Sequence, residues 1–243
     1  SDVCSSDLRM NRAQRMVYRL IQKIRSQGKP VRLIILKARQ VGISTLLAAI
    51  MYTVTRFWPR SDGRIVSFER ESAANIFSMI ELFQEALTDE IRPPVLRKTT
   101  SLLQLGNKDP RTRHLYPGLR SSVLTGTAKN LNIGRGSTYR ILHATEVAYY
   151  NRAHDTMQSL MQCVPSTPDT FVFMESSSVG AGGFFHREFM RAVQGKSEWT
   201  PVFIPFWFHE EYEDTLTPEE EMAVLADADG YERSLKDKFR NIT

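Results

Sequence analysis

The chain has 243 residues and 42% hydrophobic content, which is enough to bury one sizeable core. No stretch approaches the roughly 20 apolar residues that cross a bilayer, and the polar start shows no signal peptide, which argues against a membrane or secreted protein. The two cysteines, Cys4 and Cys163, lie far apart in sequence, so we expect no disulfide framework and a reducing compartment.

The formal net charge of +5 is unevenly spread along the chain. Residues 1–206 carry 28 Lys and Arg against 16 Asp and Glu, whereas residues 207–243 carry 4 against 11. A basic body suits a polyanionic partner such as nucleic acid. The alternative is that this surface charge only keeps the protein in solution.

The first periodic segments follow a short irregular start. Residues 1–9 show no helical or strand pattern, and we expect them to be disordered or artefactual. Residues 11–27 have apolar side chains at four-residue spacing, which predicts an amphipathic helix. The run VRLIILK at 31–37 predicts a strand buried on both faces, and we expect a helix at 44–58.

Strands and helices alternate along the rest of the chain. In order we expect a strand at 63–70, a helix at 72–87, an irregular or hairpin-like segment at 92–120, a strand at 121–128, a loop at 130–137, a strand at 138–146, a helix at 153–164, a strand at 170–178, a helix at 184–194 and a strand at 201–208. This alternation suits βαβ units, so the predicted fold class is α/β with a mostly parallel central sheet flanked by helices.

Polar residues stand where four of the predicted strands end, namely Lys37, Glu69, Glu146 and Glu175. The carboxyl ends of parallel strands meet at one edge of a sheet, and ligands bind at that edge. The agreement between independent segments therefore predicts a ligand site there.

The segment LKARQVGIST at 36–45 lies between a predicted strand and a predicted helix and has the length of a phosphate-binding loop. In the common pattern G-x-x-x-x-G-K-[ST], Gly42 takes the second glycine and Ser44 the hydroxyl that binds Mg²⁺. Ile43 stands where that pattern has its lysine. The helix N-terminus after the loop offers free N–H groups to phosphate.

A lysine at the front of the loop could replace the missing one. The side chain of Lys37 is long enough to fold over the loop, and Arg39 adds a second cation suited to phosphate. The candidate nucleotide-binding residues are Lys37, Ala38, Arg39, Gln40, Val41, Gly42, Ile43, Ser44 and Thr45. The opposing interpretation is that Lys37 and Arg39 are exposed loop charges and that Ser44 is an ordinary N-cap.

The loop K-A-R-Q-x-G-x-S-T after a buried strand resembles the ATPase of the large terminase subunit of tailed phages, the motor that packages DNA into capsids. Three further segments resemble that family in its own order: GRGSTYRILHATEVAYY its Walker B region, ESSSVGAGGFFHREF its coupling motif, and IPFWFHEEYED the stretch that leaves the ATPase core. The resemblance covers roughly residues 10–243. It implies a P-loop NTPase fold of the RecA-like (ASCE) type that binds ATP and Mg²⁺.

Hydrolysis of ATP needs a carboxylate that orients and activates water. Glu146, at the end of ILHATE, is the candidate, with a solvated strand-end carboxylate as the alternative. The residue before it, where an Mg²⁺-associated Asp is usual, is Thr145. A hydroxyl could hold an Mg²⁺-bound water with less charge, so Ser44 and Thr145 are the candidate metal residues.

Other roles come from the resemblance alone. It implies that Glu175 and Ser176–Ser178 form the coupling motif, with Ser177 close to the nucleotide. It also implies that Gln14 reads the adenine edge and that Arg135, in GRG, is an arginine finger for a neighbouring subunit. The alternative for Glu175 and Ser176–Ser178 is a Ser/Gly-rich turn, and for Gln14 it is an ordinary surface glutamine. Arg135 could instead lie in a plain turn or contact a phosphate or DNA.

Two further groups of residues are assigned no ligand. His143 and His154 are not at metal-ligand spacing with any cysteine, so we predict no zinc site. The aromatic cluster is expected to pack in the core; it comprises Phe203, Phe206, Trp207 and Phe208.

The expected protein is the ATPase portion of a terminase large subunit, with Lys37, Glu146 and Arg135 as its catalytic residues. We expect an ATPase domain at 10–208, the start of a helical linker at 209–243, and no nuclease in what looks like a fragment. The expected partner is double-stranded DNA, and we expect the chain to form a homo-oligomeric ring. By resemblance, the portal protein and the small terminase subunit are further partners. The expected location is the cytoplasm of an infected or lysogenic bacterial host, with no membrane association. The rivals are a helicase-like ATPase and a non-hydrolysing DNA-binding or assembly protein with a decayed loop.

Overall fold

The computed structural model describes residues 9–130 and 136–208, so Arg135 and the predicted linker at 209–243 lie outside the described residues. One sheet contains the strands β1 (Val31–Lys37), β2 (Asp62–Ser67), β3 (Val95–Thr99), β4 (Leu102–Leu105), β5 (Ser121–Thr127), β6 (Ile141–Thr145), β7 (Phe171–Ser176) and β8 (Thr200–Ile204). Their order is β3-β4-β5-β2-β6-β7-β1-β8. All neighbouring pairs from β5 to β8 are parallel, and β4 runs antiparallel to both β3 and β5.

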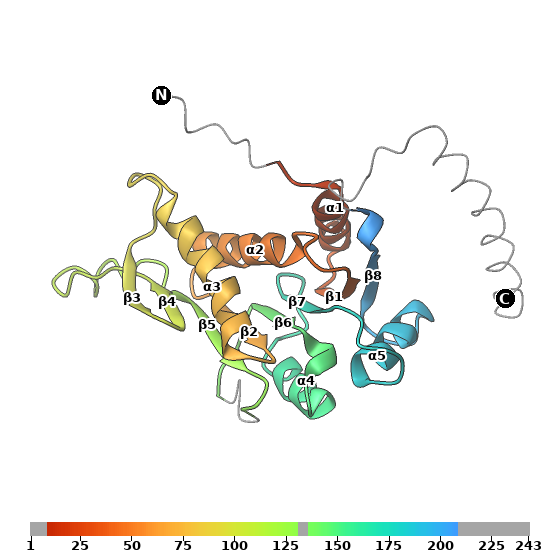
Figure 1. The fold of residues 1–243 in the computed structure, drawn as a ribbon. Helices are drawn as coiled ribbons and strands as arrows, with labels where there is room; N and C mark the ends of the chain where they lie inside the picture. Colours follow the sequence, from red (N-terminus) through yellow and green to blue (C-terminus); the bar gives the residue numbers. More distant parts are fainter. Residues whose placement is uncertain (1–8, 131–135, 209–243) are drawn as a thin grey trace, which may run out of the picture. The chain divides into compact units, whose positions relative to one another are not determined.

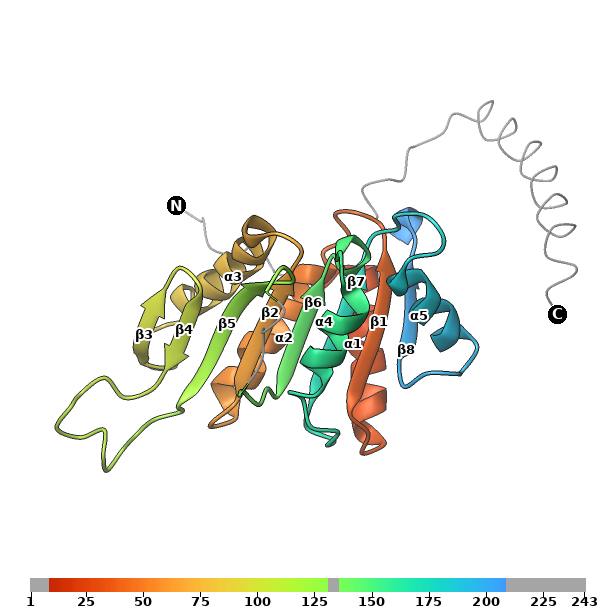
Figure 2. The same cartoon turned by 90° about the horizontal axis from the view of Figure 1, so that it is seen from below.

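Helices cover the two faces of this sheet unequally (Figure 1). The helices α1 (Arg12–Ser26), α2 (Ile43–Phe57) and α3 (Arg70–Glu85) pack on one face, and α4 (Ala153–Met161) and α5 (Phe184–Val193) pack on the other. Each face has its own apolar core. Figure 2 shows α4 and α5 over the β6–β8 part of their face, while in the described chain no helix lies in front of β3–β5.

The predicted α/β fold with a mostly parallel sheet is therefore confirmed. The strand predicted at 31–37 has those bounds, and because β1 lies between β7 and β8, its first five residues are buried. The segment 92–120 contains the hairpin of β3 and β4, followed by a loop at 107–120.

The end of the second predicted strand was wrong. β2 stops at Ser67, and Glu69 is the exposed N-cap residue of α3. The strand stops three residues earlier and the helix begins two residues earlier than the pattern indicated, and Phe68 between them packs at the edge of the second core. The polar side chain that β2 contributes at its end is Ser67.

The prediction that the aromatic cluster packs in the core was also wrong for three of its four members. Phe203, Phe206 and Trp207 are exposed, whereas Phe208 packs against the core and lies under the guanidinium of Arg12. β8 is the edge strand, and the chain leaves it at Ile204, so these rings have no further strand to pack against in the described chain.

Among the described residues, no helix is both long enough and apolar enough to cross a membrane.

Candidate functional site

The loop after β1 is anchored in the core by alternate residues. β1 ends at Lys37 and α2 begins at Ile43, with Gly42 in the left-handed conformation at φ 71°. Val41 and Ile43 are each 1% exposed and belong to the core on the α2 face. A lysine at position 43 would start from a buried apolar position, so Ile43 serves packing here.

The remaining loop residues form its outer rim. Arg39, Gln40 and Thr45 are exposed. The backbone N–H of Ala38 donates to the carbonyl oxygen of Ile204 at 2.9 Å, which fixes the start of the loop against β8. The rim therefore presents the guanidinium of Arg39 beside the N-terminus of α2, two features that suit a phosphate.

Gln14 contacts the loop directly. Its Nε2 donates to the carbonyl oxygen of Gly42 at 2.8 Å, and its Oε1 accepts from the backbone N–H of Asn11 in a capping box. Asn11 Nδ2 donates to the carbonyl oxygen of Val41 at 3.2 Å. These contacts hold the N-terminus of α1 on the loop, and the adenine-reading role of Gln14 stays a prediction.

A buried carboxylate, Glu175 at the end of β7, connects the loop to the neighbouring strands. One oxygen, Oε1, accepts from Ser44 Oγ at 2.8 Å and from Thr145 Oγ1 at 3.0 Å, and it lies 2.9 Å from His143 Nε2. The other oxygen, Oε2, lies 3.8 Å from Lys37 Nζ. Glu175 thus brings together three of the predicted site residues, one from each of α2, β1 and β6.

Electrostatics keep this carboxylate ionised. Burial raises the pKa of Glu175, but the Lys37 ammonium, His143 and the hydrogen bond from Ser44 outweigh burial and hold the pKa at about 2. An ionised carboxylate can only accept hydrogen bonds, so Nε2 of His143 carries a proton. The site is therefore a fixed negative charge bordered by one cation and two hydroxyl donors.

Sequence reasoning missed the contribution of His143, which was considered only as a zinc ligand, and it placed Glu175 in a coupling motif rather than at the centre of the site. Both residues end or lie in strands whose neighbours a sequence does not reveal. The register pairs Thr145 with Glu175 and His143 with Phe173, because β7 lies between β6 and β1. Strand order was the missing information.

Glu146 follows β6 in an unusual backbone conformation. Its φ is 59° and its ψ is 34°, the left-handed region that a glutamate rarely adopts. Its Oε2 accepts from Ser67 Oγ at the end of β2, at 3.0 Å. Ser67, which the sequence did not single out, therefore holds the candidate catalytic carboxylate. Strain of this kind gathers at functional sites.

The end of β7 is tied to the turn after Glu146. Ser176 Oγ accepts from the backbone N–H of Ala148 at 3.2 Å, and Ser177 follows as a partly exposed residue. Tyr150 donates to the carbonyl oxygen of Val66 at 2.8 Å. Burial raises the pKa of Tyr150 well above its usual range, and the charges of Glu146 and Glu175 add to that effect.

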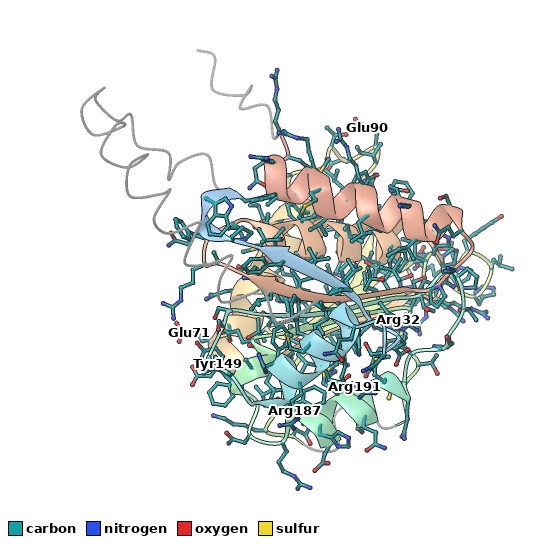
Figure 3. All side chains as sticks on the ribbon, turned by 90° about the vertical axis from the view of Figure 1, so that its right-hand side faces the viewer. Arg32, Glu71, Glu90, Tyr149, Arg187 and Arg191 are labelled. Carbon is teal, nitrogen blue, oxygen red and sulfur yellow. The ribbon has the colours of Figure 1, made fainter. Side chains whose placement is uncertain are left out.

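A separate cavity lies away from this edge, near the other end of β1. It has a volume of about 480 Å³, and its lining includes Arg32, His154 and Trp199. Five residues of strand separate Arg32 from Lys37, which is about 16 Å. Figure 3 shows Arg32 on the side of the molecule opposite Tyr149, the residue three positions after Glu146. This cavity is therefore distinct from the candidate site.

The donor set suits Mg²⁺ and a phosphate chain. Glu175 Oε2 is buried and has no hydrogen-bond partner among the described residues, although the Lys37 ammonium lies 3.8 Å away, so its lone pairs can accept a metal ion. Hydroxyl and carboxylate oxygens are the ligands that Mg²⁺ prefers. Lys37, Arg39 and the N-terminus of α2 supply the positive side.

A mostly parallel sheet with a loop and helix N-terminus at its carboxyl edge defines a P-loop NTPase-like fold. In sequence, the chain matches no protein-family model and no curated protein. In structure, it is similar to the large terminase ATPase domain of Thermus phage P74-26, with a TM-score of 0.57, 16% identity and 82% of each chain covered.

Two longer proteins are similar over the same fold. The HK97 bacteriophage large terminase has a TM-score of 0.61 and 15% identity, and the match covers 96% of this chain and 50% of that one. The large terminase of a thermophilic bacteriophage, solved in complex with ADP, has a TM-score of 0.58 and 11% identity, covering 82% and 45%. The chain has the fold of phage large terminase ATPase domains and spans about half the length of these two proteins.

Proposed function

We propose that this chain is a Mg²⁺-dependent ATPase that drives double-stranded DNA into a viral capsid. The observation that carries the proposal is the convergence of Lys37, Ser44 and Thr145 on one buried carboxylate beside an anchored loop and a helix N-terminus. The terminase fold supports the same assignment, since a relative of that fold was solved with ADP.

Each residue has a stated task in the proposed reaction. Lys37, Arg39 and the N–H groups of the loop bind the phosphates, and Ser44 and Thr145 hold the metal. Bound Mg²⁺ would neutralise charge that develops on the phosphates. Glu146 orients the attacking water as general base, at a carboxylate position that Ser67 fixes. Arg135 of a neighbouring subunit would complete the site.

The experiment that tests the proposal is a measurement of Mg²⁺-dependent ATP hydrolysis with and without duplex DNA. It compares wild type, Lys37→Ala and Glu146→Gln at several protein concentrations, because a finger supplied by a neighbour requires association. We expect turnover that rises with concentration and with DNA. Loss of a general base typically costs about 10²- to 10⁴-fold, so Glu146→Gln should fall by that factor while it still binds ATP.

A second candidate is a non-hydrolysing DNA-binding or assembly protein. Two observations favour it: Ile43 is buried at the usual lysine position, and Thr145 replaces the usual acidic residue. This candidate predicts that wild type binds ATP without turnover even when it is concentrated, supplied with DNA and completed with the rest of the longer protein.

The remaining parts of the proposal concern the longer protein. The portal protein and the small terminase subunit are its proposed partners, and any nuclease activity would belong to a region beyond this chain. Residues 209–243 would begin the linker to that region.

A further inference from the structure

We propose that Glu175 on β7 supplies the negative charge of the magnesium site, in place of the acidic residue that β6 lacks at Thr145. The inference rests on the proposed ATPase function and assigns a positioning residue to it. In the common P-loop arrangement, the acidic partner of the loop serine comes from the strand that carries the catalytic carboxylate. Here that strand, β6, ends at Thr145, and Glu146 follows it.

The register shows how an acidic residue on β7 can take the place of one on β6. Thr145 and Glu175 are paired residues on adjacent parallel strands. Paired residues of this kind project from the same face of the sheet, so their side chains are neighbours there. The short hydroxyl of Thr145 leaves room for the longer carboxylate of Glu175, which accepts the Thr145 hydroxyl proton at 3.0 Å.

The contact with Ser44 defines what the carboxylate does. Ser44 Oγ donates its proton to Glu175 Oε1 at 2.8 Å. With the proton directed to the carboxylate, the oxygen lone pairs of Ser44 are left to face a metal ion. A partner that orients a metal ligand in this way typically changes metal affinity by about 10- to 100-fold.

The two carboxylate oxygens have different surroundings. Oε1 has three partners, namely Ser44, Thr145 and His143, and is fully used. Oε2 is buried without a hydrogen-bond partner among the described residues, and the nearest charge is the Lys37 ammonium at 3.8 Å. A buried carboxylate is costly unless it is paired or binds a metal; the Lys37 ammonium balances Oε2 without a hydrogen bond, which leaves the lone pairs of this oxygen able to attract a metal ion.

The competing explanation is that Glu175 is a structural clamp between the ends of β1, β6 and β7. A clamp would affect folding and the loop in the same way with and without metal. The distinguishing quantity is therefore the metal gain, which we define as the affinity for ATPγS with Mg²⁺ divided by the affinity in EDTA.

The test measures the metal gain by calorimetry for wild type, Glu175→Gln and the control Glu81→Gln, a partly exposed glutamate on α3 that pairs with Lys98. We expect Glu175→Gln to lose roughly 10- to 100-fold of the metal gain while its affinity in EDTA is equal to or higher than that of wild type. The control should keep the full gain. Electron paramagnetic resonance of Mn²⁺ added with ADP should show the same loss of bound metal in Glu175→Gln.

The inference is overturned if folded Glu175→Gln keeps the metal gain of wild type. If Glu175→Gln does not fold, the swap of Thr145→Asp with Glu175→Thr takes its place, since it returns the charge to β6. A metal gain in the swap supports the inference, and its loss overturns it. If wild type itself binds no ATPγS, the proposed ATPase function is wrong; if wild type shows a gain that Glu175→Gln shares, only the assignment of Glu175 is wrong.

Discussion

The backbone at Glu146 is held in a conformation that costs free energy. An L-residue in the left-handed region costs about 1–2 kcal/mol, and Glu146 has neither the freedom of glycine nor the short side chain of asparagine. The conformation turns the chain sharply out of β6, so that the carboxylate reaches Ser67 on the neighbouring strand β2. The backbone strain at Glu146 therefore accompanies the placement of its carboxylate beside Ser67.

Ser67→Ala tests whether that placement matters. Without the hydroxyl, Glu146 loses the donor that fixes its Oε2, and a small misplacement of a catalytic group can cost up to about 100-fold in rate. We expect ATP turnover to fall at least about 10-fold while ATPγS affinity changes less than about 2-fold. Ser78→Ala, at an exposed serine of α3, is the control. Equal turnover in Ser67→Ala and wild type would show that Glu146 needs no such support.

Tyr150 gives a prediction for alkaline pH. Its pKa is raised above 10.0 by burial and by Glu146 and Glu175, so the folded state prefers the neutral phenol. The stability that follows is present below pH 10 and is lost as the pH rises towards the folded pKa. The free energy of unfolding of wild type should therefore fall relative to Tyr150→Phe above pH 10, by up to about 1.4 kcal/mol per pH unit.

Urea denaturation across this pH range measures the difference. Tyr116→Phe, at an exposed tyrosine, is the control, and its free energy of unfolding should change with pH in the same way as that of wild type. A constant difference between Tyr150→Phe and wild type would contradict the prediction.

At the scale of elements, the phosphate loop explains where its lysine stands. Because Val41 and Ile43 fill the core between α1 and α2, the loop is fixed by packing on one side and leaves charge for its beginning and rim. Lys37 is the last residue of β1 and faces Glu175. The displaced lysine that the sequence suggested thus has a structural counterpart, although its role with nucleotide stays a prediction.

Gly42→Ala tests the packing of this loop against α1. A Cβ at Gly42 would lie 2.8 Å from Gln14 Nε2, and φ is 71°. Gly28 has nearly the same φ of 67°, but an added Cβ there would meet nothing within 4 Å. Gly28→Ala should therefore lower the free energy of unfolding by about 1 kcal/mol, the cost of the backbone conformation alone. Gly42→Ala should lower it by about 2 kcal/mol or above, because the added Cβ also meets Gln14. If urea denaturation gave the same loss of unfolding free energy for both variants, Gln14 would have moved away from the added Cβ without a free-energy cost.

Periodicity predicted most of the elements because it depends on local sequence. The helix at 11–27 and the strand at 31–37 agree with α1 and β1 to within a residue. Strand order has no local signature, so β7 could not be placed between β1 and β6, and the contact of Glu175 with Ser44 stayed hidden. Exposure at an edge strand is equally non-local, which is why the position of Phe203 was wrong.

At the scale of the whole molecule, one cluster of exposed basic side chains lies at the β3–β5 end of the sheet, and helix α1 carries another. The loop at 107–120 presents exposed basic side chains, those of Lys108, Arg111, Arg113 and Arg120. Asp109 accepts from the backbone N–H of Arg111 at 2.9 Å and from the hydroxyl of Thr112 at 3.1 Å, so the loop has a defined shape. A basic loop of defined shape suits a DNA backbone.

Arg111→Ala with Arg113→Ala should weaken duplex DNA binding uniformly across sequences. Each phosphate contact that is lost should reduce the slope of log K against log salt by about 1. The charge-matched comparison is Lys23→Ala with Lys29→Ala, at the basic α1 end of the sheet, and the prediction for the loop requires its slope to change less than that of the arginine pair. Equal slopes for both double variants, measured by fluorescence anisotropy over a salt series, would exclude the loop from the DNA contact.

Strand order also sets the time at which this chain can fold during synthesis. Val31 of β1 pairs with Phe171 of β7, and β8 follows later still. At about 5–20 residues per second, β1 leaves the ribosome on the order of ten seconds before its first neighbour exists. During that interval β1 lacks its neighbouring strands, so yield in a cell should depend on translation rate and on chaperones.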